Sequence, residues 1–476
     1  MKEHLKKILF LIIILFISLG FYHVYKSLPE GISFKGEIFK STEEEISFLY
    51  DLTYEKDEKR IYDQKIFENV FETIDNAKKY ILVDMFLWGD GSGSSERDLA
   101  QEMTDHLIDR KKEIPELKIV VITDVYNTGY GAFESSYFEQ MKKEGIDVVF
   151  TNLDVLRDSN LIYSPIWRTF FQIFGESKKS WLGIPGYDKE GSIRSFARLL
   201  NFKANHRKLM LADCEDKMCS FVISANPATS GAEYSNIGIF LKNDIYKDIY
   251  QSEKAVLKMS GYLLEDWNFD FVDSESDLSA DIETQFLTES KIKNSILEEI
   301  NDSQEGYQIK IAIFFFSERD IIRALLEASE RGVDIEIIAD PSKRGFGRDK
   351  FGVPTRIVVD ELFVKSGGKI KIRYYDTEEE EFHTKMITFV KGDKLVSILG
   401  SANYTRRNLN DFNLEADIKI TMPLKKEISL EILEYFNKMW NNQEGNYTIE
   451  MSSFEKPSLR RQIQYRLQEF IGAGTF

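Results

Sequence analysis

Residues 205–213 read NHRKLMLAD, and residues 382–390 read FHTKMITFV. Both stretches place a His-x-Lys pair on an apolar, strand-like run, and together they use two of the five histidines in the chain. A Ser-Ala-Asn segment follows each pair, and Ser224 and Ser401 each lie 18 residues after the histidine. Equal offsets in two separate stretches indicate that one structural unit occurs twice.

The duplication extends to the segments before these pairs. In each copy, a buried strand precedes the letters Ser-Glu-Arg-Asp, a helical pattern and a second buried strand that ends in aspartate. This order predicts an α/β fold of two homologous lobes, each a sheet flanked by helices on both faces, related by pseudo-twofold symmetry. The matching segments are residues 78–88 and 307–316 for the first strand, 95–98 and 317–320 for the four letters, and Asp124 and Asp340 for the aspartates.

The two copies differ in length, and this difference defines the domain plan. Asp124 and His206 are 82 residues apart, whereas Asp340 and His383 are 43 apart, so the first copy carries an insertion of 39 residues. The 476-residue chain is long enough for two large units. We expect a membrane anchor at 1–30, a first lobe at 31–268 with an aromatic insertion near 150–200, an acidic linker at 269–288, a second lobe at 289–448 and an amphipathic helix at 449–476.

An apolar run of 18 residues, 8–25, contains no Lys, Arg, Asp or Glu. An α-helix of that length is about 27 Å long, close to the thickness of the hydrocarbon layer of a bilayer. Lysines precede the run, so the positive-inside rule places the N-terminus in the cytoplasm and the bulk of the chain outside the cell membrane. A cleaved signal peptide is the alternative, but the run is long for one and no small-x-small cleavage site follows it. We expect a single-pass anchor.

Bulk composition limits the partners of the chain and its environment. The net charge is −17 and the isoelectric point is about 5.0, which disfavours nucleic acid as a partner because a polyanion is repelled. The two cysteines, Cys214 and Cys219, flank a short turn. Outside the membrane they could form a local disulfide, and two ordinary small hydrophobic residues are the alternative.

Two segments combine apolar and basic residues in patterns that allow more than one location. The insertion contains LIYSPIWRTFFQIFGESKKSWL, in which aromatic residues alternate with Arg168, Lys178 and Lys179. This mixture suits a membrane interface, and an apolar lid over the active site is the alternative. The C-terminal segment carries an apolar stripe, which we expect to pack against the body, with docking on a membrane surface as the alternative. The stripe consists of Leu459, Ile463, Leu467 and Phe470 or Ile471.

A His-x-Lys pair on a strand presents an imidazole and an ammonium on one face, because side chains at i and i+2 point the same way. If the two copies meet, His206 with Lys208 and His383 with Lys385 converge on one electropositive pocket. Such a pocket suits a phosphodiester, whose transition state spreads negative charge over its non-bridging oxygens. One histidine could attack phosphorus while the other protonates the leaving alcohol. The lysines supply the positive charge, so we expect no metal ion and no other cofactor. Candidate neutral donors to the phosphoryl oxygens are Ser224, Asn226, Ser401 and Asn403.

These motifs resemble the two signatures of the phospholipase D superfamily. The first is HRKLMLAD at 206–213 with SAN at 224–226, and the second is HTK at 383–385 with GSANYTRRNLNDFNLEADI after it. The resemblance covers residues 60–440, and an anchored chain with NHRK is most similar to bacterial cardiolipin synthases and related phospholipases D. The resemblance implies one active site shared by two lobes and a phosphohistidine intermediate. It also implies that the first histidine is the nucleophile and the second is the acid and base.

Two positions depart from the family pattern. Val390 stands where the family has an aspartate in the second motif, whereas the first motif has Asp213 at this place. The resemblance implies that the family's aspartate has a structural role. The family also often has an acid after the Ser-x-Asn segment to hold the histidine. The second copy has Glu415 there and the first has Asn236. A carboxylate holds an imidazole better than an amide does, so we expect His383 to be the better supported ring, which leaves the choice of nucleophile open.

The sequence as a whole favours a membrane-anchored enzyme that acts on phospholipids, by hydrolysis or by transfer of a phosphatidyl group to an alcohol or second lipid. A nuclease or other phosphodiesterase built from the same parts is the alternative, although the net charge counts against it. A non-catalytic lipid-binding protein is a third hypothesis. Because a duplicated chain completes its own active site, we expect activity to require no oligomer.

Overall fold

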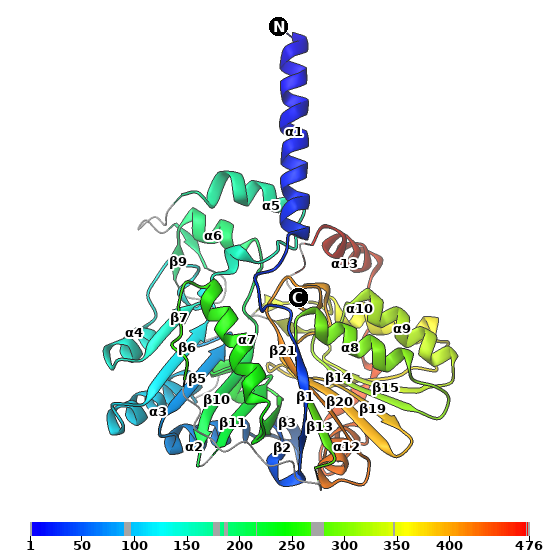
Figure 1. The fold of residues 1–476 in the computed structure, drawn as a ribbon. Coiled ribbons are helices and arrows are strands. Elements are labelled where there is room, and N and C mark those ends of the chain that lie inside the picture. Colours follow the sequence, from blue (N-terminus) through cyan, green and yellow to red (C-terminus); the bar gives the residue numbers. More distant parts are fainter. Residues whose placement is uncertain are drawn as a thin grey trace.

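Two large β-sheets lie side by side, and a long N-terminal helix projects from the body that they form (Figure 1). This computed structural model describes residues 2–89, 97–174, 181–184, 189–215, 217–267, 280–345, 348–472 and 474. Several segments singled out from the sequence lie outside these described residues, namely most of the acidic linker, Ser95 and Glu96 of the first four-letter repeat, and Lys178 and Lys179 of the insertion.

The first sheet has seven strands. Three of them, β5, β6 and β7, run parallel, while β10, β11, β12 and β2 continue the sheet on the other side of β5 in antiparallel pairs. Apolar, β-branched runs such as YILVDM in β5 favour strands that are buried on both faces. In sheet order, the strands are β2 (Ile46–Tyr50), β12 (Ile237–Leu241), β11 (Lys217–Ile223), β10 (Lys208–Cys214), β5 (Tyr80–Met85), β6 (Lys118–Thr123) and β7 (Asp147–Phe150).

The second sheet has nine strands and repeats the order of the first. Read across the sheet, the strands that correspond one by one to β2, β12, β11, β10, β5, β6 and β7 of the first sheet are β13, β21, β20, β19, β14, β15 and β18. The parallel and antiparallel pairs are the same, and β1 and β22 are added at the two edges. The prediction of two similar α/β units is confirmed, while the twofold axis between them stays a prediction. In sheet order, the strands are β1 (Lys35–Ser41), β13 (Ile282–Thr288), β21 (Ala416–Pro423), β20 (Lys394–Gly400), β19 (Lys385–Lys391), β14 (Gln308–Ile313), β15 (Asp334–Ala339), β18 (Lys371–Tyr375) and β22 (Thr448–Glu450).

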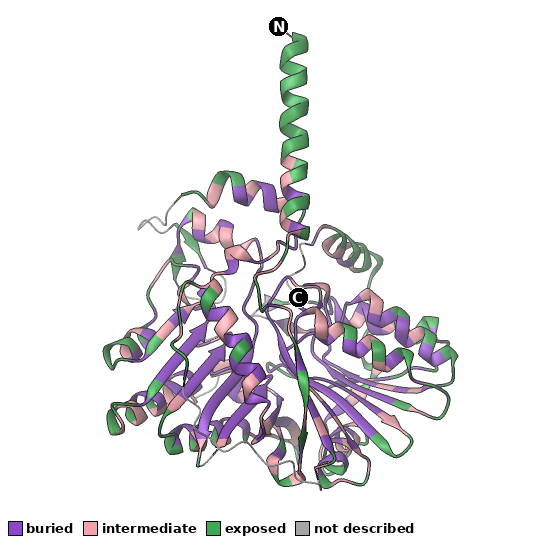
Figure 2. Ribbon diagram, in the orientation of Figure 1, coloured by how far each residue is buried: buried purple, intermediate pink, exposed green. Residues whose placement is uncertain are grey.

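Helices cover the outer face of each sheet, and a third core joins the two inner faces. Helices α2, α3 and α4 pack on the first sheet, and α8, α9 and α10 pack on the second. Helices α7 and α12 share one apolar core with the inner faces of both sheets, and Figure 2 shows most of the central strands as buried. The helices are α2 (Ile66–Asn76), α3 (Leu99–Glu113), α4 (Ser136–Lys143), α7 (Tyr246–Met259), α8 (Ser290–Asn301), α9 (Arg319–Glu330), α10 (Thr355–Lys365) and α12 (Glu427–Trp440).

The remaining elements are short or lie at the periphery. The insertion folds into α5 (Tyr163–Ile166), a π-helix (Trp167–Phe171) and α6 (Ile193–Leu199), and α11 (Arg406–Leu409) and α13 (Leu459–Ile471) follow in the second half. Three hairpins pair β3 (Leu52–Lys56) with β4 (Lys59–Asp63), β8 (Leu182–Gly183) with β9 (Glu190–Gly191), and β16 (Arg344–Gly345) with β17 (Arg348–Asp349). The 3₁₀ turns are Glu43–Glu45, Val125–Thr128, Leu153–Val155, Thr229–Glu233 and Met451–Ser453.

The N-terminal helix α1 (Lys2–Tyr25) is long and apolar enough to cross a membrane. It stands apart from both sheets, and only its last turns approach the body (Figure 1). Most of its large apolar side chains are exposed, in contrast to those of the central strands of the two large sheets (Figure 2). By length and composition, α1 therefore meets the requirement for a transmembrane helix.

Three features near the predicted boundaries differ from expectation or settle an alternative. The acidic linker is shorter than expected at its C-terminal end, because Ile282–Thr288 pairs with two strands as β13. The C-terminal helix begins at Leu459, ten residues later than expected, because the chain first adds β22 to the second sheet. Cys214 and Cys219 form a disulfide across the turn between β10 and β11, with their Cα atoms 5.8 Å apart.

Candidate active site

Each His-x-Lys pair lies where a strand begins. Lys208 is the first residue of β10 and Lys385 is the first residue of β19, so both histidines precede their strands and the prediction that they lie within them was wrong. The reason is that the backbone before each lysine forms its hydrogen bonds with segments other than the neighbouring strands. For example, the amide of His206 donates to the carbonyl oxygen of Leu414 at 2.9 Å. Each lysine Nζ donates to the carbonyl oxygen of its own histidine at 2.7 Å.

The two pairs meet in one buried site. The side chains of both histidines and both lysines are almost completely shielded from solvent. The positive charges of Lys208 and Lys385 both act on the ring of His206, and both also act on the ring of His383. The convergence expected from the duplicated motif is therefore what the structure has.

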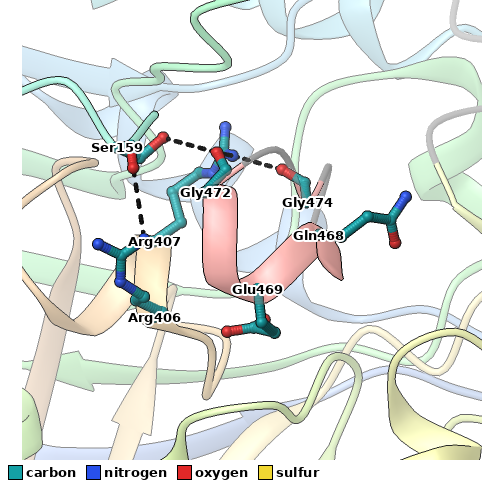
Figure 3. Close-up of a pocket in the computed structure, with 7 residues that line it drawn as sticks. All are labelled: Ser159, Arg406, Arg407, Gln468, Glu469, Gly472 and Gly474. Atoms are coloured by element: carbon teal, nitrogen blue, oxygen red, sulfur yellow. Dashed lines mark hydrogen bonds between the residues drawn. The ribbon is translucent and has the colours of Figure 1, made fainter. Parts of the chain in front are cut away.

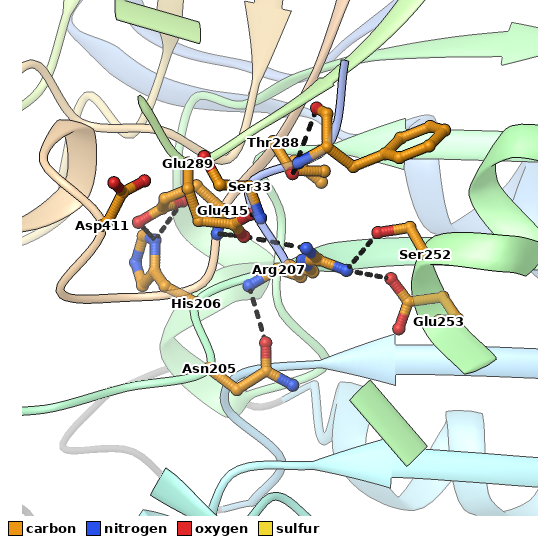
Figure 4. Close-up of polar contacts among 12 residues, drawn as sticks. Ser33, Asn205, His206, Arg207, Ser252, Glu253, Thr288, Glu289, Asp411 and Glu415 are labelled. Carbon is orange, nitrogen blue, oxygen red and sulfur yellow. Dashed lines mark hydrogen bonds and ion pairs between the residues drawn. The ribbon is translucent and has the colours of Figure 1, made fainter. Parts of the chain in front are cut away.

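Each histidine takes its partner from the other half of the chain. Nδ1 of His206 lies 2.9 and 3.0 Å from the two carboxylate oxygens of Glu415, as Figure 4 shows. Nδ1 of His383 lies 3.2 Å from Oδ1 of Asn236. The expectation that Glu415 supports His383 was wrong, because the segments that follow the Ser-Ala-Asn motifs cross the boundary between the halves. The better supported ring is that of His206.

The serines of the Ser-Ala-Asn segments hold these partners rather than offer free hydroxyl groups to a substrate. Ser401 Oγ donates to Glu415 Oε2 at 2.5 Å and accepts from the amide of Ala416 at 2.9 Å. Ser224 Oγ donates to Asn236 Oδ1 at 3.1 Å and accepts from a backbone amide at 3.0 Å. Their expected role as direct donors to phosphoryl oxygens is not what the structure has, because each hydroxyl hydrogen is already engaged. They position Glu415 and Asn236.

The two asparagines of these segments also have matching contacts. Asn226 Oδ1 accepts from the backbone amide of Leu87 at 3.1 Å, and Asn403 Oδ1 accepts from that of Phe315 at 3.4 Å. In both halves the side-chain oxygen is therefore directed at the loop that follows the first parallel strand. The amide nitrogen of each side chain is the group that can donate to an anion.

The aspartates that end the second strand of each repeat fix the segment before each histidine. Asp124 accepts from the backbone amide of Asn205 at 2.6 Å, and Asp340 accepts from that of Phe382 at 2.9 Å. Burial raises the pKa of Asp124 to about 7 and that of Asp340 to about 8. The sequence marked both aspartates as parts of the repeat, and in the structure each binds the backbone amide of the residue directly before a histidine.

Asp213 lies at the far end of β10 from His206. Its carboxylate accepts from three successive backbone amides, those of residues 78–80, at 2.8 to 2.9 Å. These amides precede β5, so the contact joins the ends of two neighbouring strands. Val390 occupies the matching place in β19, opposite Gln308 of β14. This geometry matches the structural role that the family resemblance implied for Asp213.

Burial and like charges lower the pKa values of the two histidines and the two lysines. Burial, followed by the charges of the two lysines, lowers the pKa of both His206 and His383 well below its ordinary value. Burial also lowers the pKa of Lys208 to about 7, and burial together with the charge of Lys208 lowers the pKa of Lys385 well below its usual range. Glu415 is buried as well, which raises its pKa to about 8, although Lys208 and its hydrogen-bond donors act in the opposite direction. A bound anion would relieve this imbalance of positive charge.

Two phenylalanines that the sequence analysis overlooked line the same site. Phe86 follows β5 and its ring centroid lies 4.9 Å from that of His206, while Phe314 follows β14 at 5.2 Å from His383. The ammonium groups of Lys208 and Lys385 lie 5.2 and 5.1 Å from the same two ring centroids. Because Phe86 and Phe314 occupy the same position in the two repeats, a residue-by-residue comparison of the copies could have found them.

Behind Glu415 lies a buried network of charges, drawn in Figure 4. Glu289 Oε1 accepts from the backbone amide of Glu415 at 3.0 Å and from Arg207 Nη2 at 2.8 Å. Arg207 also donates to Glu253 at 2.7 Å, and Glu289 Oε2 accepts from the amide of Ser33 at 2.7 Å. The network thus ties the segment after α1 and both halves of the chain to the partner of His206.

In the described part of the chain, no cluster of three His, Cys, Asp or Glu side chains could hold a metal ion.

Comparisons with known proteins agree with this fold. Residues 296–440 match the family described as "Cardiolipin synthase, PLD-like domain". The crystal structure of phosphatidylserine synthase from Haemophilus influenzae Rd KW20 is similar, with a TM-score of 0.57 and 13% identity over 92% of this chain and 95% of that one. Polyphosphate kinase from Porphyromonas gingivalis (TM-score 0.45, 13% identity, 94% of this chain and 57% of that one) also matches. So does Nuc, a phospholipase D family member from Salmonella typhimurium (TM-score 0.27, 20% identity, 35% of this chain and 98% of that one).

No curated protein matches the chain in sequence. The match at 296–440 makes the second half a phospholipase D-like domain, and the first half repeats its strand order and its His-x-Lys motif. The protein is thus an α/β enzyme whose two halves share one buried His–Lys site. The family match covers residues 296–440, and the similarity to the synthase structure extends the same fold to nearly the whole chain.

Proposed function

We propose that the protein is a membrane-anchored phospholipase D-type enzyme that cleaves or transfers the phosphodiester of phospholipids through a phosphohistidine intermediate. One observation carries the proposal: two His–Lys pairs from different halves of the chain meet in one buried site, where the charges of both lysines act on both imidazole rings. A phosphodiester bears the single negative charge and the oxygens that such a site can bind. The names of the matching family and of the synthase with a similar fold favour a lipid diester as the substrate.

His206 is the nucleophile in this proposal. Its Nδ1 faces the carboxylate of Glu415, so Nε2 is the nitrogen available to attack phosphorus. Attack forms an N–P bond, and the bond from phosphorus to the leaving alcohol breaks. The bound anion offsets the lysine charges that lower the pKa of His383, so this ring carries the proton that it gives to the alcohol. His383 then takes a proton from water or from an acceptor alcohol, whose oxygen attacks phosphorus and releases Nε2 of His206.

The other residues stabilise charge on the phosphoryl group. Lys208 and Lys385 offset the negative charge of the non-bridging oxygens, and their own low affinity for protons in the free site rises once an anion binds. The amide nitrogens of Asn226 and Asn403 add neutral donors. Whether water or an alcohol attacks the phosphohistidine decides between phosphatidic acid and a new phospholipid as the product.

The anchor places this chemistry at a membrane. Helix α1 has the length and composition of a membrane span, and the lysines before it favour a cytoplasmic N-terminus and an extracytoplasmic catalytic domain. The acidic net charge of −17 disfavours nucleic acid as a substrate. Both halves of the active site lie in one chain, so the proposed chemistry needs no oligomer.

The test uses the purified full-length protein in mixed vesicles of phosphatidylglycerol and phosphatidylethanolamine, with lipid products resolved by mass spectrometry. Cardiolipin formation would identify a phosphatidyl transferase, and phosphatidic acid alone would identify a hydrolase. His206→Ala and His383→Ala should both abolish product. His106→Ala is the matched control, because this histidine lies on α3, contacts Asp75 at 2.6 Å and stacks on Phe71, away from the site. Cleavage of DNA or RNA without any lipid product would overturn the proposal in favour of a nuclease.

A further inference from the structure

The apolar stripe of α13 faces away from the body of the protein. Its four large side chains are between 51% and 87% exposed, whereas Tyr465 on the opposite side of the helix is fully buried in the core of the second half. The expectation that the stripe packs against the body was wrong, because the helix uses its other face for that contact. The stripe consists of Leu459, Ile463, Leu467 and Phe470.

The C-terminal end of α13 is held firmly against the insertion (Figure 3). Gly472 ends the helix with a φ of 69°, and a side chain there would collide with the carbonyl oxygen of Ser159, since a Cβ would lie 2.0 Å from it. Ser159 Oγ donates to the carbonyl oxygen of Gly472 at 3.3 Å, and Arg407 Nη2 donates to the same oxygen at 3.2 Å. The outward direction of the stripe is therefore fixed by contacts at the helix end.

The same contact region holds the end of α1. Asp158, the residue before Ser159, donates its amide to the carbonyl oxygen of His23 at 3.0 Å, and Arg157 Nε donates to that of Lys26 at 2.7 Å. Helix α13 and the base of α1 are thus attached to one short segment, and Figure 1 shows them side by side. Any membrane that α1 crosses lies next to the exposed stripe of α13.

The insertion adds a second apolar surface on the other side of α1. Its exposed side chains are 57% to 73% accessible, and the ring of Phe170 lies 6.4 Å from that of Phe16 on α1. Phe16 is about 13 Å along the helix axis from Tyr25, the last residue of α1, so the insertion reaches up beside the span. Gly20 permits this approach, because a Cβ there would lie 2.7 Å from the carbonyl oxygen of Leu161. The four side chains in this range beside α1 are Ile162, Phe170, Ile173 and Phe174.

Arg168, one of the basic residues in the insertion, faces inward. Arg168 is buried and pairs with Asp158, with Nη2 2.8 Å from Oδ1 and Nε 2.9 Å from Oδ2. It holds the π-helix against the segment that bonds to α1. The apolar side chains of the insertion are left as its outward surface, which suits a hydrocarbon layer rather than the active site.

We propose that the stripe of α13 and the exposed side chains of the insertion form one docking face that is buried in the outer leaflet of a lipid bilayer around α1. The proposal rests on α1 being the membrane anchor of the proposed function. The bilayer is the occupant because α1 continues from the same face and exposes its own apolar side chains (Figure 2). Arg460 flanks the stripe and is exposed, so it can reach the headgroups of anionic lipids, whereas Arg466 pairs with Glu361 at 2.8 Å.

The test measures depth in the membrane without relying on catalysis. Single cysteines replace Leu467, Phe470, Phe170 or Leu430 in the full chain, and a nitroxide label is attached; the two native cysteines are already joined in the disulfide. Leu430 is the matched control, because it is 55% exposed on α12 at the opposite end of the molecule from α1 (Figure 1). A label at Phe10, in the middle of α1, reports whether the anchor itself is in lipid. The protein is reconstituted in nanodiscs of phosphatidylglycerol and phosphatidylethanolamine.

Labels at 467, 470 and 170 should be accessible to oxygen and shielded from a water-soluble nickel complex, as at Phe10, while the label at Leu430 should show the reverse. Water exposure at 467 and 470 with Phe10 in lipid would overturn this inference alone. Water exposure at Phe10 would overturn the anchor and with it the localisation in the proposed function. Magnetic coupling between labels on separate copies, without oxygen accessibility, would show that a second copy of the chain covers the stripe instead.

Discussion

The two halves of the active site are built alike and differ at one contact. Each half supplies a His–Lys pair, an aspartate that fixes the preceding backbone and a phenylalanine beside the ring. The ring of His206, however, meets the carboxylate of Glu415, whereas that of His383 meets the amide of Asn236. A carboxylate stabilises positive charge on the imidazole and an amide only orients the ring. This difference supports the proposal that the duplicated halves divide the chemistry and that His206 forms the covalent bond.

Removing each histidine in turn should have the largest effect on activity and should separate the roles of the two rings. With a phosphodiester that has a nitrophenol leaving group, His206→Ala should lose at least about 10⁴-fold in kcat/KM, because no covalent bond to phosphorus can form. His383→Ala should still react with this substrate, since nitrophenol leaves without a proton, and should then accumulate the phosphohistidine for lack of a base. Intact-protein mass spectrometry detects the adduct. An adduct in His206→Ala but none in His383→Ala would reverse the assignment.

Exchanging the two partners should have the next largest effect. Glu415→Gln should lower kcat by about 10²-fold, because the amide leaves Nδ1 of His206 without a negative charge to support the ring. Asn236→Asp should change kcat much less, since it adds a carboxylate to the ring that acts as acid and base. Both rates come from the same nitrophenyl substrate, with the amount of folded protein checked by circular dichroism. Equal losses in the two variants would show that the partners are interchangeable and that the asymmetry has no catalytic meaning.

The repeat pattern predicted the fold and the convergence of the two His–Lys pairs, but not how the two copies exchange their partners. Alternating apolar runs and equal offsets specify strands, helices and the His–Lys motifs, because these depend on local periodicity. The contact between Glu415 and His206 joins residues 209 positions apart, and no pattern within one copy indicates that the segments after its serine cross to the other copy. The stripe of α13 shows the same limit. An apolar helix face has the same sequence pattern whether it meets a protein core or a lipid layer.

Asp213 and Val390 offer a comparison of stability rather than of catalysis. Asp213→Val should lower the free energy of unfolding by about 2 kcal/mol, because three backbone amides lose a charged acceptor while the start of β5 stays partly open to water. Asp213→Asn should cost less, since an amide oxygen can still accept. Urea unfolding of the solubilised protein measures both. Val390→Asp should give no gain, because Tyr307 N in the matching loop already donates to Gln304 O at 3.1 Å.

The lowered pKa values of the two lysines predict how kcat/KM and kcat each depend on pH. Burial lowers the pKa of Lys208 to about 7 and moves that of Lys385 in the same direction, so the ammonium charges that bind the phosphodiester are lost as the pH rises above neutrality. Because kcat/KM reports the free enzyme, it should fall by about tenfold per pH unit above pH 7 on a dispersed short-chain phospholipid. A bound anion raises the pKa of both lysines, so the fall in kcat should begin at a higher pH. Lys208→Arg keeps its charge and should weaken the fall in kcat/KM, whereas a kcat/KM that rises from pH 7 to 9 would contradict the assignment of the lysines as the phosphate-binding charges.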